Sequence, residues 1–145
     1  MRRFQYPVTL TRERKGGFTV RFADLPEAIT SGGDRAEALA QAADCLEEAI
    51  AGRITDGLEI PQPSAAARKQ SLVAVPAPMA AKAALYLALR EAKMKNTELA
   101  RLLRCNEKEV RRMLDPRHPT KLPRIEAALA ALGKRLVVSM EGEAA

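Results

Sequence analysis

The sequence is poor in aromatic residues and in the residue types that build metal and redox sites. Its 145 residues include no tryptophan, two tyrosines, three phenylalanines, one histidine and two cysteines. Cys45 and Cys105 fall in opposite halves of the chain, and their spacing matches no metal or redox motif. We therefore expect no metal, no cofactor and two cysteines that act as small core residues. Cores made mainly of Leu, Val, Ile and Ala are thin, which favours oligomerisation.

Long apolar runs are also absent. No stretch approaches the ~18 residues needed to cross a bilayer, and residues 1–7 lack the apolar segment of a secretion signal. The hydrophobic content of 47% nevertheless excludes general disorder. The sequence therefore predicts a folded cytoplasmic protein with no membrane partner.

Charge is unevenly distributed along the chain. Residues 1–63 hold 8 Lys/Arg and 10 Asp/Glu, a net charge of −2, whereas residues 64–145 hold 16 and 8, a net charge of +8. A basic segment suits a polyanion such as nucleic acid, and an acidic segment suits a basic partner. The asymmetry predicts two halves with different partners, although a solvated surface with an accidental skew is the alternative.

The first half has the pattern of a small sheet. Residues 4–12 and 18–22 alternate apolar and polar side chains on either side of a turn with two adjacent glycines, which is typical of a β-hairpin. Residues 28–31 are a candidate third strand. Pro7 has no backbone N–H, so it is expected to place the first strand at an edge or to limit its pairing on one side.

A helix follows this hairpin. Asp34 and Glu37 have the spacing of a capping box, in which carboxylate oxygens accept from unpaired backbone N–H groups. The apolar residues of the expected helix face are Leu39, Ala43, Leu46 and Ile50. Gly52 is expected to end the helix.

The two halves meet in a stretch rich in proline, alanine and serine. Residues 61–71 are typical of a linker or of a long connection, and the apolar run at 72–75 is a candidate further strand of the first domain. We predict an α+β protein in which domain 1–76 is a small antiparallel sheet with one packed helix, and domain 77–145 is all-α with a terminal strand. That strand, Leu136–Met140, has unmet backbone groups and is expected to pair in a homodimer or tetramer.

Residues 95–114 are typical of a helix-turn-helix. The expected inner faces of the two helices are Leu99, Ala100 and Leu103, and Val110, Met113 and Leu114. Ala100 is small enough for two helices to cross closely, and Asn106 with Glu109 repeats the capping-box spacing. Arg104 stands in the turn where a glycine is usual, and left-handed backbone costs another residue roughly 1–2 kcal/mol.

The outward face of the second helix predicts the contacts with DNA. At about 100° per residue, Lys108, Arg111 and Arg112 point away from the buried side, where they can donate to base edges in the major groove. Residues 95–124 carry 9 Lys/Arg and 4 Asp/Glu, a net charge of +5. The candidate DNA-binding residues are Asn96, Asn106, Glu107, Lys108, Arg111, Arg112, Arg117, His118 and Lys121.

Each remaining candidate has a distinct expected role. Glu107 can accept from cytosine, and Asn96 can hold a phosphate at a helix N-terminus. Arg117, His118 and Lys121 follow the recognition helix and can clamp the DNA backbone. Asn106 and Glu109 are expected to serve mainly as caps. The alternative is a helical bundle with a basic, solvated face.

Motifs in both halves together resemble the HicB antitoxins. The N-terminal motifs are Tyr6-Pro-Val-Thr-Leu, Gly16-Gly-Phe-Thr-Val, Phe22-Ala-Asp-Leu-Pro, Gly33-Asp and Glu37-Ala-Leu. The C-terminal motifs are Glu98-Leu-Ala-Arg-Leu-Leu, Val110-Arg-Arg-Met-Leu, Thr120-Lys and Ala131-Leu-Gly-Lys. The resemblance covers almost the whole chain. It departs at Phe22-Ala-Asp-Leu-Pro-Glu, where the family often has Phe-Pro-Asp-Leu-Pro-Gly, so the turn after Phe22 is not implied by it.

The resemblance implies a fold and two binding partners. The first domain would be a partial RNase H-like fold that holds a HicA toxin, a small basic mRNA interferase. The antitoxin would neutralise that toxin by covering its active site, and would repress its own operon by binding operator DNA through the helix-turn-helix.

Two other functions compete with this one. A solitary helix-turn-helix regulator, with an N-terminal domain that binds a ligand or only oligomerises, would lack an adjacent gene for a small basic protein. A nuclease on an RNase H-like fold would need paired carboxylates for two-metal chemistry. The candidates Asp24, Asp34 and Asp44 fall in a turn, at a cap and on a polar helix face, so we expect no enzymatic activity.

Overall fold

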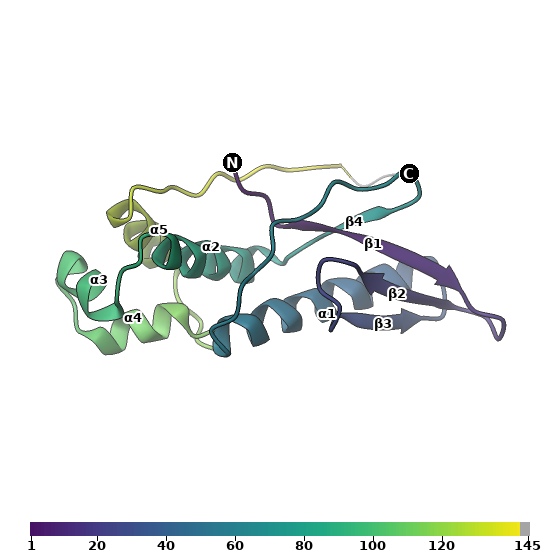
Figure 1. The fold of residues 1–145 in the computed structure, drawn as a ribbon, viewed down its shortest axis with the longest axis horizontal. Coiled ribbons are helices and arrows are strands. Elements are labelled where there is room, and N and C mark those ends of the chain that lie inside the picture. Colours follow the sequence, from purple (N-terminus) through teal and green to yellow (C-terminus); the bar gives the residue numbers. More distant parts are fainter. Residues whose placement is uncertain (143–145) are drawn as a thin grey trace. The chain divides into compact units, whose positions relative to one another are not determined.

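The computed structural model describes residues 1–142 and has the predicted α+β fold. The chain divides into two compact units, Met1–Ala83 and Ala84–Ala145, and the division falls within one helix, α2. The described elements, labelled in Figure 1, are β1 (Gln5–Arg12), β2 (Phe18–Phe22), β3 (Ile29–Gly32), α1 (Arg35–Thr55), β4 (Ser71–Ala74), α2 (Ala77–Glu91), α3 (Asn96–Leu103), α4 (Glu107–Leu114) and α5 (Leu122–Ala131).

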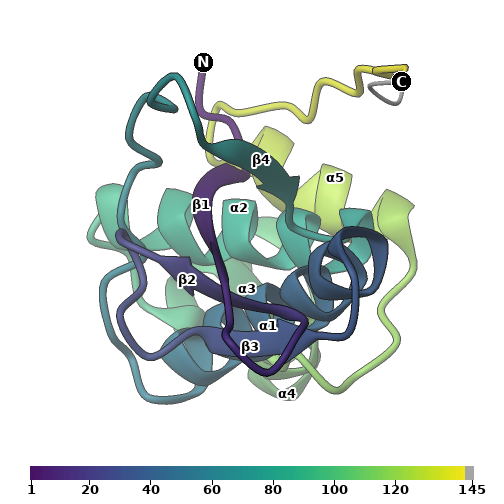
Figure 2. The ribbon, with the colours of Figure 1, turned by 90° about the vertical axis from the view of Figure 1, so that its right-hand side faces the viewer.

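The strands of the first unit form an antiparallel sheet in the order β3-β2-β1-β4 (Figure 2). β1 pairs with β2 from Val8 to Arg12 and with β4 from Gln5 to Val8. Of the two expectations for Pro7, the edge position is wrong, because β1 is an interior strand. The limit on pairing at one side is confirmed, because Pro7 pairs with Leu72 of β4 but lies just outside the β1–β2 ladder. The candidate third strand exists one residue later than predicted, and the apolar run at 72–75 supplies β4.

One face of this sheet carries the core. The register places Val8 opposite Phe22 and Tyr6 opposite Val73, so these four side chains share a face. All four are buried, and α1 contacts β2, β3 and β4. The alternation seen in the sequence is therefore the alternation between the helix-covered face of the sheet and its other face.

The entry into α1 is tight. The side chain of Asp34 accepts from the backbone N–H of Glu37 at 2.8 Å, as the spacing predicts. The Glu37 carboxylate in turn accepts from the N–H of Gly33 at 3.1 Å, one residue before the cap. A Cβ at Gly32 would lie 2.3 Å from the backbone nitrogen of Ala38. Only glycine allows β3 and the first turn of α1 to approach this closely.

The end of α1 differs from the prediction. The helix continues through Gly52 to Thr55, so the expected end at Gly52 is wrong. The buried residues of α1 are Ala38, Ala42, Leu46, Ile50 and Ile54, whereas Leu39 and Ala43 are only half-buried. Burial of Ile54 in the turn after Gly52 offsets the ~1 kcal/mol that a glycine costs inside a helix.

Residues 57–70, which lead from α1 to β4, are held against the first unit by hydrogen bonds. The Tyr6 hydroxyl donates to the carbonyl of Pro61 at 2.6 Å, and burial raises the pKa of Tyr6. The Asp24 carboxylate accepts from both the backbone N–H and the hydroxyl of Ser64. Of the two interpretations of residues 61–71, the structure favours the long connection.

The second unit is helical within its described residues. α3 packs against both α4 and α5. The buried side chains of these three helices are Leu99, Ala100, Val110, Met113, Ile125, Ala128 and Leu129. The predicted terminal strand is wrong for the single chain, because residues 134–142 hold no strand; its pairing with a second copy stays a prediction. Val138 is 87% exposed and Met140 is 96% exposed.

Candidate functional site

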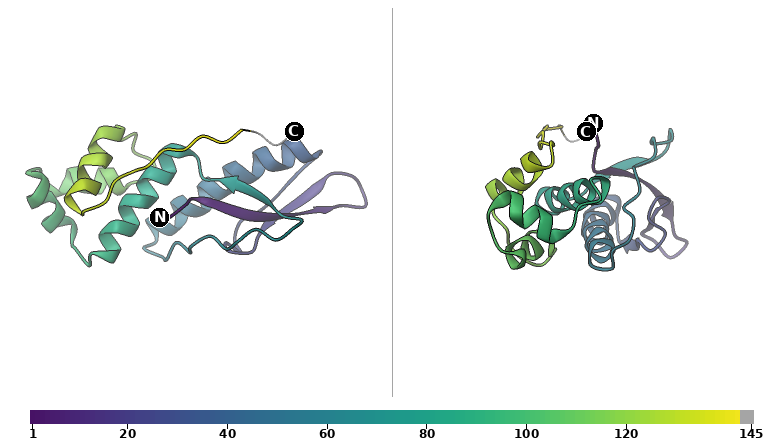
Figure 3. Two further views of the ribbon diagram at one scale, coloured as in Figure 1. Left: turned by 90° about the horizontal axis from the view of Figure 1, so that it is seen from above. Right: turned by 60° about the vertical axis from the view of Figure 1, so that its left-hand side comes forward.

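The helix pair α3–α4 stands at the position that the sequence predicts for a helix-turn-helix (Figure 3, green). Arg104 ends α3 in the left-handed conformation, with φ 54° and ψ 45°, as its place in the turn required. The N–H of Cys105 donates to the carbonyl of Ala100 at 3.0 Å and closes the turn. Two short helices joined by three residues are thus present, and their use in binding DNA stays a prediction.

α4 begins at the predicted cap. The Asn106 side-chain oxygen accepts from the N–H of Glu109 at 3.0 Å. The backbone N–H of Glu109 serves the cap, whereas its carboxylate pairs with the guanidinium of Arg124 in α5 at 3.3 Å. Burial and the neighbouring Glu109 raise the pKa of Cys105 in the preceding turn. Arg124 is a residue that sequence reasoning missed, since fifteen positions separate it from Glu109 and no local spacing links them.

The basic residues of α4 lie opposite its buried side. Val110 and Met113 are buried, whereas Lys108, Arg111 and Arg112 are exposed. At about 100° per residue, Lys108 points almost directly away from the buried side, and Arg111 and Arg112 flank it at equal angles. The structure therefore gathers the three predicted base-contacting cations on one accessible face, which we call the α4 basic face.

Glu107 lies beside this face. Its Oε2 is 2.9 Å from Nε of Arg111, one helical turn away. The side chain of Arg111 is 63% exposed and that of Glu107 is 35% exposed. Arg111, one of the three cations of the α4 basic face, is thus held by a carboxylate of its own helix.

The loop after α4 carries the predicted backbone clamp. The backbone N–H of Arg117 donates to Oδ1 of Asp115 at 3.0 Å, and the Arg117 side chain is exposed. His118 is half-buried, with Nδ1 3.1 Å from the hydroxyl of Thr120. Lys121 is exposed at the start of α5. Arg117 and Lys121 are therefore accessible to a large ligand, whereas His118 helps to shape the loop.

The predicted phosphate site at the start of α3 is partly filled by the chain itself. Asn96 is the first residue of α3 and is half-buried. The Glu98 carboxylate accepts from the backbone N–H of Lys95 at 3.3 Å. A carboxylate at this helix N-terminus already provides the negative charge that a phosphate would bring, so Asn96 is the weakest of the predicted contacts.

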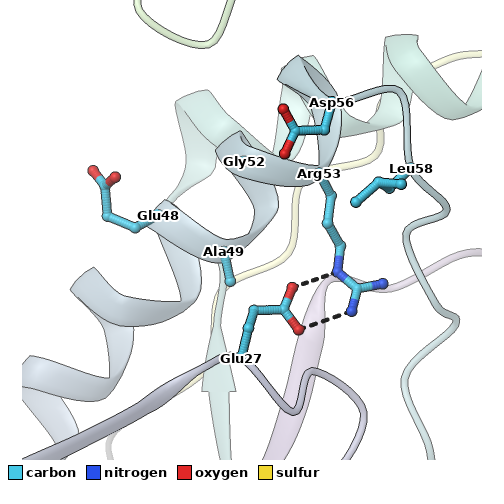
Figure 4. A pocket seen from close by; sticks show the side chains of 7 residues that line it. All are labelled: Glu27, Glu48, Ala49, Gly52, Arg53, Asp56 and Leu58. Carbon is cyan, nitrogen blue, oxygen red and sulfur yellow. Dashed lines mark hydrogen bonds and ion pairs between the residues drawn. The ribbon is translucent and has the colours of Figure 1, made fainter.

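The first unit carries a hollow of about 440 Å³ along α1. Figure 4 shows the guanidinium of Arg53 facing the carboxylate of Glu27, with Nε to Oε2 at 2.6 Å and Nη2 to Oε1 at 2.8 Å. This two-bond pairing with Arg53 lowers the pKa of Glu27. Glu48 and Asp56 add two further carboxylates to the rim, so the hollow is acidic overall.

The expectation that both cysteines lie in the core is wrong. Cys45 and Cys105 are free and only half-buried. Burial raises the pKa of the Cys45 thiol, which donates weakly to the carbonyl of Ile29. Within residues 1–142, no three His, Cys, Asp or Glu side chains are grouped so as to hold a metal ion. Across the same residues, no helix has the length and apolar character needed to cross a bilayer.

The comparisons with known proteins agree on one family. Residues 5–84 match the family model described as HicB-like antitoxin of bacterial toxin–antitoxin systems. "Antitoxin HicB 2" of Photorhabdus laumondii is 42% identical over 132 residues, which cover 91% of this chain and 93% of that protein. "Antitoxin HicB" of Escherichia coli K12 is 37% identical, covering 94% of this chain and 99% of its own length. A Pseudomonas fluorescens relative with the same name is 33% identical over 139 residues, covering 95% and 94%.

These matches extend through both units, so the resemblance first recognised in short motifs is confirmed. They also confirm the prediction of a protein that is not an enzyme, since the relatives are antitoxins. The chain belongs to the HicB-like family of bacterial antitoxins.

Proposed function

We propose that this antitoxin binds operator DNA through the α4 basic face to repress its own operon, and neutralises a HicA-type toxin through its first unit. The observation that carries the DNA-binding half is the exposure of Lys108, Arg111 and Arg112 on a helix whose opposite side is buried. An α-helix fits into the major groove of B-DNA, and Arg and Lys donate there to guanine O6 and N7. The exposed Arg117 and Lys121 would add phosphate contacts that fix the position of the helix.

The test of DNA binding is the double substitution Arg111→Ala and Arg112→Ala. The two side chains are each worth about 1–3 kcal/mol. Their loss should weaken binding to a duplex from upstream of the operon by about 100-fold or more. The matched control replaces Arg14 and Lys15, two exposed cations of the β1–β2 turn in the other unit, and should leave operator affinity within about twofold. Normal operator binding by the Arg111/Arg112 variant would refute the assignment of α4.

Salt dependence gives a second readout. Each phosphate contact releases condensed counterions, so operator affinity should fall steeply as salt rises. Substituting Lys121 by Ala should lower the magnitude of the slope of log K against log salt by about one. Substituting Lys15, in the other unit, should leave the slope unchanged.

The first unit supplies the surface proposed to hold the toxin. Asp44 and Glu48 are one turn apart on the exposed side of α1, and Glu48 also lines the acidic hollow with Asp56. A row of carboxylates steers and binds a basic protein. The proposed toxin is a small basic protein, so this side of α1 is the surface that its charge fits.

The test of toxin binding uses the full chain. A truncation near Ser71 would remove β4, which pairs with β1, and would therefore disturb the sheet. Reversing both charges, with Asp44→Lys and Glu48→Lys, should abolish rescue of growth from the toxin encoded by the neighbouring gene while operator binding persists. The control reverses Glu126 and Glu141 in the second unit, both exposed, and should still rescue. Full rescue by the α1 variant would exclude this surface.

Operator recognition also requires two copies. Half-sites lie about 34 Å apart, or one DNA turn, so one helix pair reads only half of such a site. The segment Leu136–Met140 has exposed apolar side chains, and pairing with its counterpart in a second chain would satisfy its backbone groups. Removal of the residues from Arg135 onward should convert the dimer to a monomer in sedimentation equilibrium, and a variant that stays dimeric would refute this pairing.

A further inference from the structure

The recognition helix carries negative as well as positive charge. α4 contains Lys108, Arg111 and Arg112, but also Glu107 and Glu109. Glu109 lies at one edge of the basic face and is compensated from α5 by Arg124 at 3.3 Å. Glu107 lies at the other edge, with its carboxylate 2.9 Å from Arg111. The two glutamates therefore reduce the charge that α4 itself presents to phosphates to a small net positive value.

Glu107 is stabilised where it is by two independent features. It is the first residue of α4, where the partial positive charge of the helix N-terminus favours a carboxylate. It also lies one turn from Arg111, the spacing at which opposite charges meet on a helix surface. The carboxylate is thus held close to the basic face and is not free to turn away without losing both interactions.

This pairing leaves most of the Arg111 guanidinium available. The recorded contact uses Nε, whereas a guanidinium has five N–H donors in a planar fork. The terminal nitrogens of the 63% exposed side chain can still donate to the two acceptors of a guanine. The carboxylate limits the directions in which that fork can turn, so less conformational entropy is lost when a base is bound.

We propose that Glu107 is a specificity-determining residue, which orients Arg111 toward a base edge and weakens binding to DNA that offers only phosphates. The inference rests on the operator binding proposed above. Its physical basis is that a carboxylate beside the helix repels the DNA backbone at every site, whereas the oriented guanidinium rewards only the correct base. Arg111 without Glu107 would bind phosphates in many orientations and would discriminate less.

The test compares operator and scrambled duplexes of equal length at one salt concentration, using the full chain. Substitution Glu107→Gln should tighten binding to the scrambled duplex by roughly tenfold and operator binding by much less, so that the ratio of the two affinities falls by about fivefold or more. The control Glu126→Gln removes one negative charge from an exposed position of α5. It should change both affinities alike and leave the ratio unaltered.

A double-mutant cycle separates orientation of Arg111 from simple charge removal. In an Arg111→Ala background, Glu107→Gln should no longer lower the affinity ratio, because its partner is gone. An equal fall in the ratio with and without Arg111, or no fall at all in the otherwise unaltered chain, would overturn the inference. If the unaltered chain shows no preference for the operator over the scrambled duplex, the proposed DNA-binding function itself is refuted, and this inference with it.

Discussion

α1 and α4 begin in the same way and then diverge. Each has an Asx side chain at the cap that accepts from the backbone N–H three residues later, at 2.8 Å from Asp34 and 3.0 Å from Asn106. The glutamate at that third position differs, because Glu37 reaches back to its own helix entrance whereas Glu109 crosses to α5. The same four-residue spacing therefore has a local role in one unit and a tertiary role in the other.

The two helices also differ in what lies on their exposed sides. α1 is long and exposes carboxylates such as Asp44 and Glu48, whereas α4 has eight residues and exposes Lys108, Arg111 and Arg112. Both bury an apolar side against their own unit. The exposed sides of the two helices therefore carry opposite charge, as the proposed function requires of a protein with an anionic and a basic partner.

The largest expected effect concerns the packing of α1 on the sheet. Replacing Gly32 by Ala forces a Cβ to within 2.3 Å of backbone at Ala38, and should destabilise the first unit by about 3 kcal/mol. The contrasting change Gly52→Ala meets nothing within 4 Å and should stabilise α1 by about 1 kcal/mol. Amide hydrogen exchange measured for each unit separates these effects. Equal protection in both variants would contradict the close approach of β3 and α1.

The caps of α1 and α4 should contribute equally to stability, although Glu37 and Glu109 have different partners. Asp34→Ala and Asn106→Ala each remove one side-chain acceptor from a helix N-terminus, which costs about 1 kcal/mol. Hydrogen exchange should show the loss in α1 for the first variant and in α4 for the second. A loss confined to one of them would show that its cap is redundant with tertiary packing.

A smaller gain is expected in the turn before α4. Arg104 has φ 54°, which costs a residue other than glycine roughly 1–2 kcal/mol. Arg104→Gly should therefore stabilise the second unit by about 0.5–1 kcal/mol in urea unfolding, with Arg101→Gly, inside α3, as a control that destabilises by a similar amount. An unchanged midpoint for Arg104→Gly would mean that the arginine side chain compensates for its backbone.

The smallest effect is a pH dependence confined to the first unit. Arg53 lowers the pKa of Glu27 below 4.5, so the pair contributes stability above that pH and loses it as pH falls through the lowered pKa. The Glu27 side chain is 45% exposed, so the contribution is at most about 1 kcal/mol. Glu27→Gln should be less stable than the unaltered chain at pH 7, and the gap should close as pH falls through the lowered pKa of Glu27. A gap that persists in acid would point to packing rather than charge.

Much of the fold could be predicted because its determinants are local. The hairpin glycines have positive φ, at +94° for Gly16 and +82° for Gly17, as the turn between two alternating strands requires. The caps at Asp34 and Asn106, and the turn at Arg104, follow from interactions that span three or four residues. The exposed cations of α4 follow from helical periodicity alone.

The errors came from interactions between distant residues. Gly52 predicts the end of α1 because the cost of a glycine inside a helix is local, whereas the burial of Ile54 that extends α1 depends on tertiary packing. Pro7 predicts either an edge strand or pairing limited on one side, and only the register with β4, about 65 positions away, decides between them in favour of the second. Leu136–Met140 was expected to be a strand on its pattern, but a strand exists only with a partner to pair with.

The sequence by itself determined where α1 and α4 start, where the turn of α3–α4 lies and which side of α4 is basic, because each depends on neighbours within one helical turn. Only the tertiary structure decided that β1 is interior, that residues 57–70 are held to the sheet at Pro61 and Ser64, and that Glu109 pairs with Arg124. Those partners are far apart in the sequence and meet only when apolar surface is buried, so no local spacing predicts them.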